Sequence, residues 1–214
     1  MSNLNKRILT SFPLLILAVY AIYNNNILVL SLYIISAILV YEFLNILKNI
    51  FKRNKINSFI FLNLFILYIC FFASQIYFFL SGEFENKENI FLFILSICIF
   101  TDIGGYVFGK IFKGKKLTSI SPNKTFNGML GSFLCSYIVC ILFIAYFNFS
   151  FNLIIFTFLI SLVSQTGDLF ISYLKRKAKI KDTGNFLPGH GGMLDRLDGM
   201  IFAVPLGIKI FIFF

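Results

Sequence analysis

Long runs of apolar residues constrain this chain more than any other feature of its sequence. Each run is rich in Phe, Ile and Leu and approaches the ~20 residues that a helix needs to cross a bilayer core. The runs cover residues 8–23, 27–47, 56–80, 90–112, 129–148, 153–174 and 197–214. Hydrophobic residues make up 58% of the chain and charged residues 13%, whereas soluble domains average about 45–50% and about 25%. We therefore predict an all-α, polytopic integral membrane protein with about seven transmembrane helices.

The basic residues fall almost entirely in alternate connections between these runs. Of the 19 Lys and Arg residues, 17 lie within residues 6–7, 48–55, 110–124 and 175–196. Short cytoplasmic loops carry an excess of Lys and Arg, so these regions and the N-terminus are predicted to face the cytoplasm, and the C-terminus the opposite side. Charges placed this close to membrane spans favour a role in topology and headgroup attraction over nucleic-acid binding.

Five acidic residues lie in the two most charged inner regions or in the runs that border them. A charge in hydrocarbon costs roughly 2.5–3.5 kcal/mol on insertion scales, so such residues usually face a cavity or a partner. Carboxylates from separate helices that meet at a cytoplasmic cavity would suit Mg²⁺ rather than zinc. A structural network of ion pairs is the alternative. The five residues are Asp102, Asp168, Asp182, Asp195 and Asp198.

Of the other acidic residues, three lie in the outer SGEFENKEN stretch at 81–89, where solvation explains them. The last is Glu42, near the inner end of the second run, and it is interpreted as a partner of a loop lysine.

Helical spacing predicts which polar side chains share a face. Asp195 and Asp198 are three residues apart and are expected on one face at the start of the last run. In the sixth run, one face is predicted to carry Gln165, Asp168, Ser172 and Lys175. In the fourth run, one face is predicted to carry Asp102, Gly105, Tyr106 and Gly109. The two glycines of this second face also fit close packing between helices.

Two loops offer groups that suit phosphate. In LPGHGG, Pro188 fixes the backbone and the glycines let N–H groups approach an anion, beside a helix expected to begin near Met193. His190 is a candidate functional residue because glycines flank it and an acidic helix start follows, and a loop histidine without a role is the alternative. In SPNKT, Lys124 lies between the hydroxyls of Ser121 and Thr125.

The cysteines all fall within apolar runs, and none forms a CxxC pair. They are interpreted as small buried apolar residues rather than as metal ligands or disulfide partners. They are Cys70, Cys98, Cys135 and Cys140.

The stretch SYLKRKAKIKDTGNFLPGHGGMLDRLD, at residues 172–198, resembles the C-terminal signature of phosphatidate cytidylyltransferases, also called CDP-diacylglycerol synthases. It matches the pattern S-x-x-K-R-x4-K-D-x-G-x2-[LIF]-P-x-H-G-G-x2-D-R-x-D at every fixed position. The stretches TDIGGYVFGK, SPNKT and SQTGD resemble further family elements in the same order. The resemblance covers residues 101–214, which we take as a catalytic transmembrane region that follows the N-terminal helices of residues 1–100.

The resemblance implies a membrane-bound nucleotidyltransferase of phospholipid biosynthesis. Such an enzyme converts CTP and phosphatidic acid into CDP-diacylglycerol and pyrophosphate at the cytoplasmic side of a bacterial-type cell membrane. It implies Mg²⁺ as cofactor and the lipid bilayer as partner, with a homodimer as one option for its assembly. The implied metal-binding residues are Asp168 and Asp195, with Asp198 and Asp102 as nearby ligands.

The resemblance also implies roles for the charged residues and the glycines of the two loops. The implied catalytic residues are Asp168, Lys175, Arg176, Lys181, Asp182, His190, Asp195, Arg196 and Asp198. The implied substrate-binding residues are Ser121, Lys124, Thr125, Ser172, Gly189, Gly191 and Gly192.

Two other classes of membrane protein are weighed against this interpretation. A CTP-dependent membrane lipid kinase would use the same nucleotide and a similar site. A transporter of an anionic solute would also place charges between helices, but it favours broken helices and internal repeats near the bilayer midplane. The sequence shows no internal repeat, and its charges cluster at one predicted face.

Overall fold

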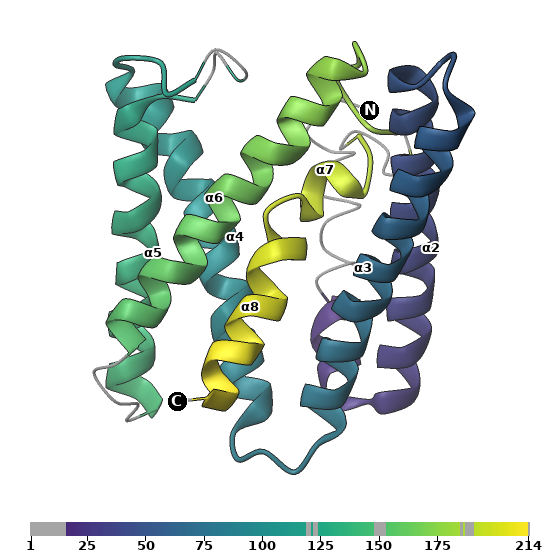
Figure 1. Ribbon diagram of the computed structural model, residues 1–214. Helices are drawn as coiled ribbons and strands as arrows, with labels where there is room; N and C mark the ends of the chain where they lie inside the picture. The colour runs from purple at the N-terminus through teal and green to yellow at the C-terminus, as the bar shows by residue number, and fades with distance from the viewer. Residues whose placement is uncertain are drawn as a thin grey trace, which may run out of the picture. The chain divides into compact units, whose positions relative to one another are not determined.

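The computed structural model describes residues 16–118, 121, 124–147, 153–184, 186 and 191–213. Within these ranges every extended regular element is a helix, and Lys116 and Thr125 form an isolated antiparallel bridge (Figure 1). The chain divides into two compact units. Unit 1 comprises Met1–Glu88 and Leu174–Leu197, and unit 2 comprises Asn89–Tyr173 and Asp198–Phe214.

Among the described residues, five helices are long and apolar enough to cross a membrane. They are α2 (Asn25–Ile50), α3 (Lys55–Ser81), α4 (Lys87–Phe112), α5 (Phe126–Phe147) and α6 (Leu153–Lys177). The shortest has 22 residues, so at about 1.5 Å per residue each exceeds the ~30 Å bilayer core. The prediction of an all-α, polytopic membrane protein is confirmed.

The first and last predicted spans differ from these five. Residues 16–23 are helical, and the rest of the first span lies outside the described residues. The last span is interrupted, because helix α7 (Leu194–Leu197) is followed by a turn and then by α8 (Met200–Phe213). Helix α8 has 14 residues, or roughly 21 Å, less than the bilayer core. The count of seven spans stays a prediction.

In unit 1, α2 and α3 pack against each other as neighbours along their length (Figure 1). Asparagine side chains cap both helices, since Asn24 accepts from the N–H of Ile27 and Asn54 from the N–H of Asn57. Between the helices, the rings of Phe43 and Phe65 stack with centroids 3.8 Å apart. Apolar runs and polar caps therefore place two long helices side by side.

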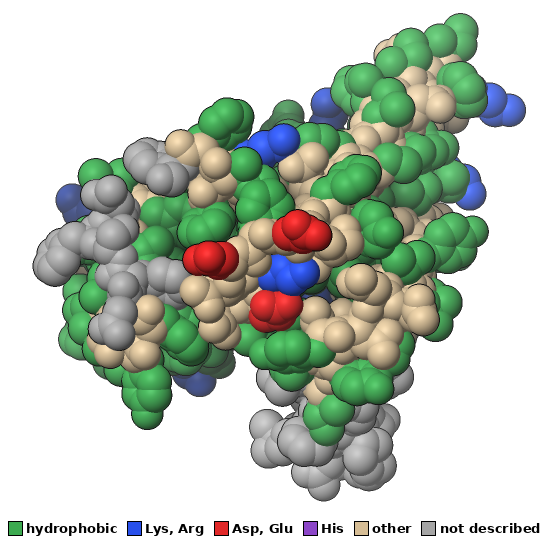
Figure 2. Space-filling view, turned by 90° about the horizontal axis from the view of Figure 1, so that it is seen from below, with side chains coloured by type: hydrophobic (Ala, Val, Ile, Leu, Met, Phe, Trp, Pro, Cys, Tyr) green, Lys and Arg blue, Asp and Glu red, His purple; other side chains and the backbone are tan. Residues whose placement is uncertain are grey.

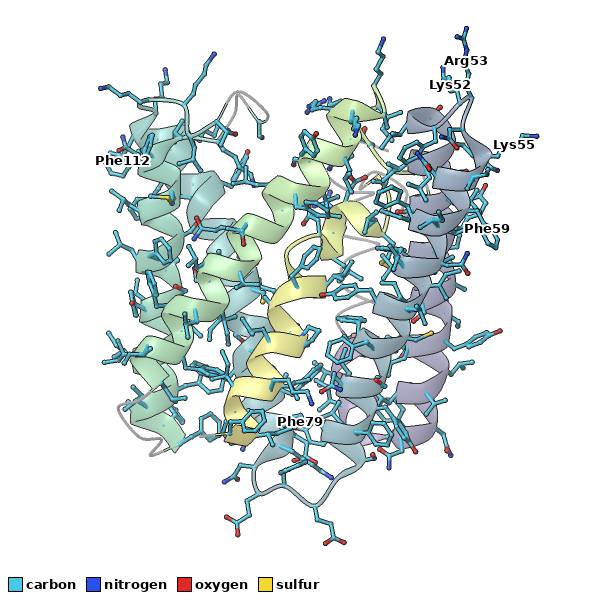
Figure 3. The ribbon with its side chains drawn as sticks, viewed as in Figure 1. Lys52, Arg53, Lys55, Phe59, Phe79 and Phe112 are labelled. Carbon is cyan, nitrogen blue, oxygen red and sulfur yellow. The ribbon has the colours of Figure 1, made fainter. Side chains whose placement is uncertain are left out.

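The two ends of α3 carry opposite charge. Lys52, Arg53 and Lys55 lie at its first end, and α3 continues past Phe79 to an acidic loop (Figure 3). Glu83 and Glu85 of that loop are exposed, and Figure 2 shows acidic side chains on the face seen from below. This arrangement accords with the predicted alternation of loops, whereas the side that faces the cytoplasm stays a prediction.

In unit 2, α4 and α5 approach closely where both carry glycine. A Cβ at Gly104 would overlap the carbonyl oxygen of Gly131, and a Cβ at Gly128 would lie 3.3 Å from the Cα of Gly109. Aromatic rings extend the contact, with Phe93 of α4 and Phe143 of α5 4.8 Å apart. Close helix packing therefore accounts for Gly109, in the way that small residues serve in membrane bundles.

All four cysteines are free and lie in helices. Cys98 and Cys140 are buried and Cys135 is partly buried, as predicted. The expectation of burial is wrong for Cys70, which is exposed on α3. An apolar side chain on a helix that crosses a bilayer needs no protein around it, because lipid tails are as apolar as a protein core.

Candidate functional site: a cavity in unit 2 and a carboxylate cluster in unit 1

A cavity of about 300 Å³ opens in unit 2 among α4, α5, α6 and the connection that precedes α5. Helix α4 contributes Asp102 and α6 contributes Gln165 and Asp168. The connection contributes Lys124 and Thr125. Residues from separate parts of the sequence, singled out as candidates in three different motifs, thus line one space.

The SPNKT connection is held in place by backbone hydrogen bonds. The N–H of Leu117 donates to the carbonyl of Lys124 at 2.8 Å, and the N–H of Lys124 donates to the carbonyl of Ser121 at 3.0 Å. The hydroxyl of Thr125 accepts from the N–H of Gly128 at 3.1 Å and so caps α5. This fold presents Lys124 to the cavity, where it forms an ion pair with Asp168.

The predicted polar face of α6 is confirmed for the residues that lie in unit 2. Gln165 and Asp168 line the same cavity, and the hydroxyl of Ser172 donates to Asp168 Oδ1 at 3.3 Å. The Lys124 and Asp168 side chains keep 28% and 25% of their surface exposed. A pair this accessible can exchange partners when a charged ligand enters.

Thr101 and Ser132, which also line the cavity, belong to a network of hydrogen-bonded hydroxyl groups. Ser132 Oγ donates to the carbonyl of Thr101 at 2.7 Å, and Thr101 Oγ1 donates to Ser161 Oγ at 2.9 Å. Gln165 Nε2 also donates to Ser161 Oγ, at 3.3 Å. These bonds join α4, α5 and α6, and they keep buried polar groups satisfied within an apolar bundle.

The cavity fits a magnesium ion by the chemistry of its donors. Mg²⁺ is commonly held by one or two carboxylates together with water and substrate phosphates. Asp102 and Asp168 supply two carboxylates to one cavity, with the hydroxyls of Ser121 and Thr125 beside them. Among the described residues, no group of three or more His, Cys, Asp or Glu side chains could by itself hold a metal.

A second polar cluster lies in unit 1, around Asp195 of α7. Lys175 donates to Asp195 Oδ1 at 2.7 Å. The N–H groups of Thr183 and Gly192 donate to Asp195 Oδ2 at 2.8 and 3.1 Å. Only 11% of the Lys175 side chain and 10% of the Asp195 side chain are exposed. Both oxygens of Asp195 are therefore engaged by the protein itself.

The pKa of Asp195 reflects opposing effects. Burial raises the pKa of this carboxyl, while the hydrogen bonds from Lys175, Thr183 and Gly192 and the charge of Lys175 lower it. The lowering effects prevail, so the pKa lies below its ordinary value. Asp195 is accordingly a carboxylate at neutral pH.

Glu42 of α2 belongs to the same cluster, and the sequence interpretation of this residue is wrong. It accepts from the N–H of Met193 at 2.9 Å, from the N–H of Leu194 at 2.8 Å and from the hydroxyl of Thr183 at 2.7 Å. Its partners are therefore the start of α7 and a threonine rather than a loop lysine, because the helix start presents N–H groups that need acceptors. An acidic residue inside an apolar run was the signal available in the sequence.

The other candidate residues of the 172–198 signature are partly described by the structure. Gly189 and His190 fall outside the described residues. Helix α7 begins at Leu194, as predicted, and Gly191 has a φ of 84°, which favours glycine. Four of the candidate site residues in this stretch have side chains exposed to solvent: Arg176, Lys181, Asp182 and Arg196.

The expectation that Asp195 and Asp198 share one helical face is wrong, because α7 ends at Leu197 and a turn follows. Asp198 is buried in unit 2, where its Oδ1 accepts from the N–H of Gly199 at 2.9 Å. The convergence of all five acidic residues stays a prediction.

Comparison with known proteins supports the signature found in the sequence. A phosphatidate cytidylyltransferase of Rickettsia felis is 44% identical over 140 residues, which cover 60% of this chain and 60% of that protein. A phosphatidate cytidylyltransferase of Staphylococcus haemolyticus is 42% identical over 119 residues, which cover 54% of this chain and 46% of that protein. One from Staphylococcus aureus strain COL is 42% identical over 133 residues, or 60% of this chain and 51% of that protein. The chain thus spans about half the length of the curated relatives it matches.

A sequence profile of the cytidylyltransferase family matches residues 2–214. That match extends over both structural units and includes both the cavity and the carboxylate cluster. The chain therefore belongs to the cytidylyltransferase family.

Proposed function

We propose that this protein is a phosphatidate cytidylyltransferase, which transfers the cytidylyl group of CTP to phosphatidic acid and releases pyrophosphate. The observation that carries the proposal is the cavity of unit 2, where Lys124, Asp102 and Asp168 meet among spanning helices. Relatives that carry this name support it. A site set among spanning helices suits a substrate whose acyl chains stay in the bilayer.

The chemistry requires that two polyanions be brought together. An oxygen of the lipid phosphate attacks the α-phosphorus of CTP, and the bond from that phosphorus to the bridging oxygen of the β-phosphate breaks. Pyrophosphate leaves with the electron pair. The attacking phosphate is already ionised, so no side chain has to remove a proton, and catalysis consists mainly of positioning and charge neutralisation.

The residues of the cavity suit this task. Lys124 is paired with Asp168, and an incoming phosphate competes with that carboxylate for the ammonium group. Exchange of partners would bring the cation to the phosphate and release the oxygens of Asp168 as ligands. The hydroxyls of Ser121 and Thr125, which line the same cavity, can contact phosphate oxygens.

Magnesium would be held in this cavity by Asp102 and Asp168. When bound, Mg²⁺ supplies positive charge to phosphate oxygens. The roles of Asp195 and Asp198 as further ligands stay predictions, as do the phosphate contacts assigned to Lys175, Arg176, Lys181 and Arg196. A homodimer is likewise a prediction.

Transfer of radiolabel from CTP tests the proposed function. Purified protein in mixed micelles with phosphatidic acid receives CTP labelled at either the α- or the γ-phosphate, and the lipid is then extracted. We expect the α-label in the lipid and the γ-label in pyrophosphate. Label from the γ-position in the lipid would instead identify a CTP-dependent lipid kinase, and an unlabelled lipid would exclude both enzymes.

We further propose that the loop between α2 and α3 faces the cytoplasm, because it carries Lys52, Arg53 and Lys55. Single cysteines at Arg53 and Glu85, both exposed and at opposite ends of α3, form a matched pair in a background without the native cysteines. In intact cells, an impermeant thiol reagent should label Glu85→Cys and leave Arg53→Cys unlabelled. The reverse pattern would overturn the orientation.

A further inference from the structure

Glu42 lies in a largely apolar helix and is almost fully buried. Helix α2 contains no other acidic residue, and Glu42 is 1% exposed. An ionisable side chain within a membrane-spanning helix is costly to bury, so it calls for a partner or a function. Nothing in the proposed chemistry of the cavity uses this residue.

The partners of Glu42 are all distant in sequence. The hydroxyl of Thr183 lies 141 positions further along the chain, and the N–H groups of Met193 and Leu194 lie 151 and 152 positions further. Each carboxylate oxygen receives at least one of these bonds. Glu42 therefore connects α2 to Thr183 and to the start of α7, the described residues at the two ends of the intervening loop segment.

Thr183 links Glu42 to the Lys175–Asp195 pair. Its hydroxyl oxygen lies 2.7 Å from Glu42 Oε2 and 3.0 Å from Asp195 Oδ2. A hydroxyl has one proton, so it can donate to one carboxylate at a time, while the N–H of Thr183 stays with Asp195 at 2.8 Å. The position of Thr183 thus depends on Glu42, and the position of Asp195 depends on Thr183.

Two signature glycines leave room for this arrangement. A Cβ at Gly184 would lie 2.8 Å from Glu42 Oε1, and a Cβ at Gly192 would overlap the hydroxyl of Thr183. The N–H of Gly192 donates to Asp195. At these two positions the glycines accommodate carboxylates of the protein itself.

We propose that Glu42 is a positioning residue for cytidylyl transfer. By holding Thr183 and the start of α7, it keeps the Lys175–Asp195 pair in one geometry. Its effect on turnover rests on the proposed function, whereas its effect on the loop rests on the hydrogen bonds alone.

The test is Glu42→Gln, which keeps the size of the side chain and replaces one acceptor oxygen by an NH₂ group. That NH₂ group cannot accept a hydrogen bond, so it would face the N–H or O–H donors that now bond to the carboxylate. We expect the amides of Met193 and Leu194 to exchange hydrogen at least about tenfold faster, and kcat to fall about tenfold with KM for CTP within about twofold of wild type.

Leu39→Val is the matched control. Leu39 lies one turn from Glu42 on α2 and is 0% exposed, so the change weakens the packing of the same helix and keeps the carboxylate of Glu42 as an acceptor. We expect a lower melting temperature, with kcat and the exchange of the two amides unchanged. An equal fall of kcat in Leu39→Val and Glu42→Gln at the same loss of melting temperature would show a merely structural role and overturn the proposal.

Thr183→Val provides a second variant in case Glu42→Gln does not fold. It removes the hydroxyl between Glu42 and Asp195 and leaves the two bonds from Glu42 to the start of α7. We expect kcat to fall without faster hydrogen exchange at Met193 and Leu194. In the double variant Glu42→Gln with Thr183→Val, kcat should fall by less than the product of the two single reductions. Wild-type kcat in Thr183→Val would overturn the proposal.

Failure of the proposed function would be distinguishable from failure of this inference. If wild-type protein put no α-label into lipid, the proposed function would be wrong. Hydrogen exchange at Met193 and Leu194 would still decide whether Glu42 stabilises the start of α7. Wild-type exchange in folded Glu42→Gln would overturn the inference whatever the activity.

Discussion

The ion pair of the cavity and the ion pair of the cluster differ in how fully the protein satisfies them. Asp168 pairs with Lys124 and receives one long bond from Ser172, and about a quarter of each charged side chain stays exposed, at 25% and 28%. Asp195 pairs with Lys175, receives further bonds from Thr183 and Gly192, and is 10% exposed. A lysine and an aspartate thus form two different ion pairs. Lys124–Asp168 is the accessible pair, which a ligand can reach. Lys175–Asp195 is the closed pair, whose aspartate is also bonded to backbone N–H groups.

The largest expected effect is that of Asp168→Asn on catalysis. The change removes one of the two cavity carboxylates proposed to hold Mg²⁺, so the rate of CDP-diacylglycerol formation should fall about 1,000-fold. The melting temperature in detergent should hold or rise, because an accessible ion pair contributes little to stability.

The control for this variant is Glu85→Gln, which changes an exposed carboxylate in the acidic loop. It should retain both activity and melting temperature. An Asp168→Asn enzyme within a few-fold of wild-type activity would show that the accessible pair is not the reactive one.

Asp195→Asn is expected to lower stability as well as turnover, unlike Asp168→Asn, which should leave stability intact. The change leaves Lys175 largely buried without a charged partner, so the free energy of unfolding should fall by about 3 kcal/mol. Because the pKa of Asp195 is lowered in the folded protein, its stabilising contribution is present above the ordinary pKa of 3.8 and is lost as the pH falls through the lowered value. Chemical unfolding in detergent at neutral pH measures the loss.

A double change, Lys175→Met with Asp195→Asn, removes both charges and keeps an acceptor oxygen for the N–H groups of Thr183 and Gly192, so it should recover much of this stability. Wild-type unfolding of Asp195→Asn would mean that the closed pair is no more important to the fold than the accessible one.

Arg196→Lys tests an exposed residue of the signature that lies next to the closed pair. Lysine keeps the charge but loses the planar fork that can bind a phosphate through two hydrogen bonds, so kcat should fall about tenfold. Melting should be unchanged, as it should be for the control Arg53→Lys at an exposed loop position. Full activity of Arg196→Lys would show that Arg196 contributes only its positive charge.

The smallest effect is expected for Thr125→Ala at the edge of the cavity. Loss of the cap on α5 should lower the stability by about 1 kcal/mol, and Thr125→Ser should restore it because serine caps equally well. Thermal unfolding of the two variants measures the difference. Equal melting of alanine, serine and wild-type proteins would show that the bond from Gly128 does not stabilise unit 2.

The spanning helices could be predicted because they follow from local chemistry. Apolar runs such as 56–80 need only enough length and few charges to form a helix in a bilayer, and α3 extends from Lys55 to Ser81. The polar face of α6 follows from helical spacing in the same way, and Asp168 and Ser172 are in contact. The last run could not be resolved, since hydropathy does not register the turn at Asp198 and Gly199.

The role of Glu42 could not be predicted, because its partners lie 141 or more positions away. The glycines of the signature were expected to approach a ligand anion, yet Gly192 lies against Glu42, Thr183 and Asp195. A glycine-rich motif indicates that the backbone closely approaches another group, but it does not show whether that group belongs to a ligand or to the protein.

The sequence alone determined the membrane-spanning helical class, the positions of five long helices and the residues that carry charge, because length, hydropathy and helical period act within single segments. Tertiary structure decided which carboxylate faces a cavity and which is enclosed. Asp168 and Asp195 are both aspartates that pair with a lysine distant in sequence. They differ because α4 and the SPNKT connection leave space around Asp168, whereas Thr183, Gly192 and Lys175 enclose Asp195. Burial and hydrogen-bond partners come from segments far apart in the chain, and only the fold brings those segments together.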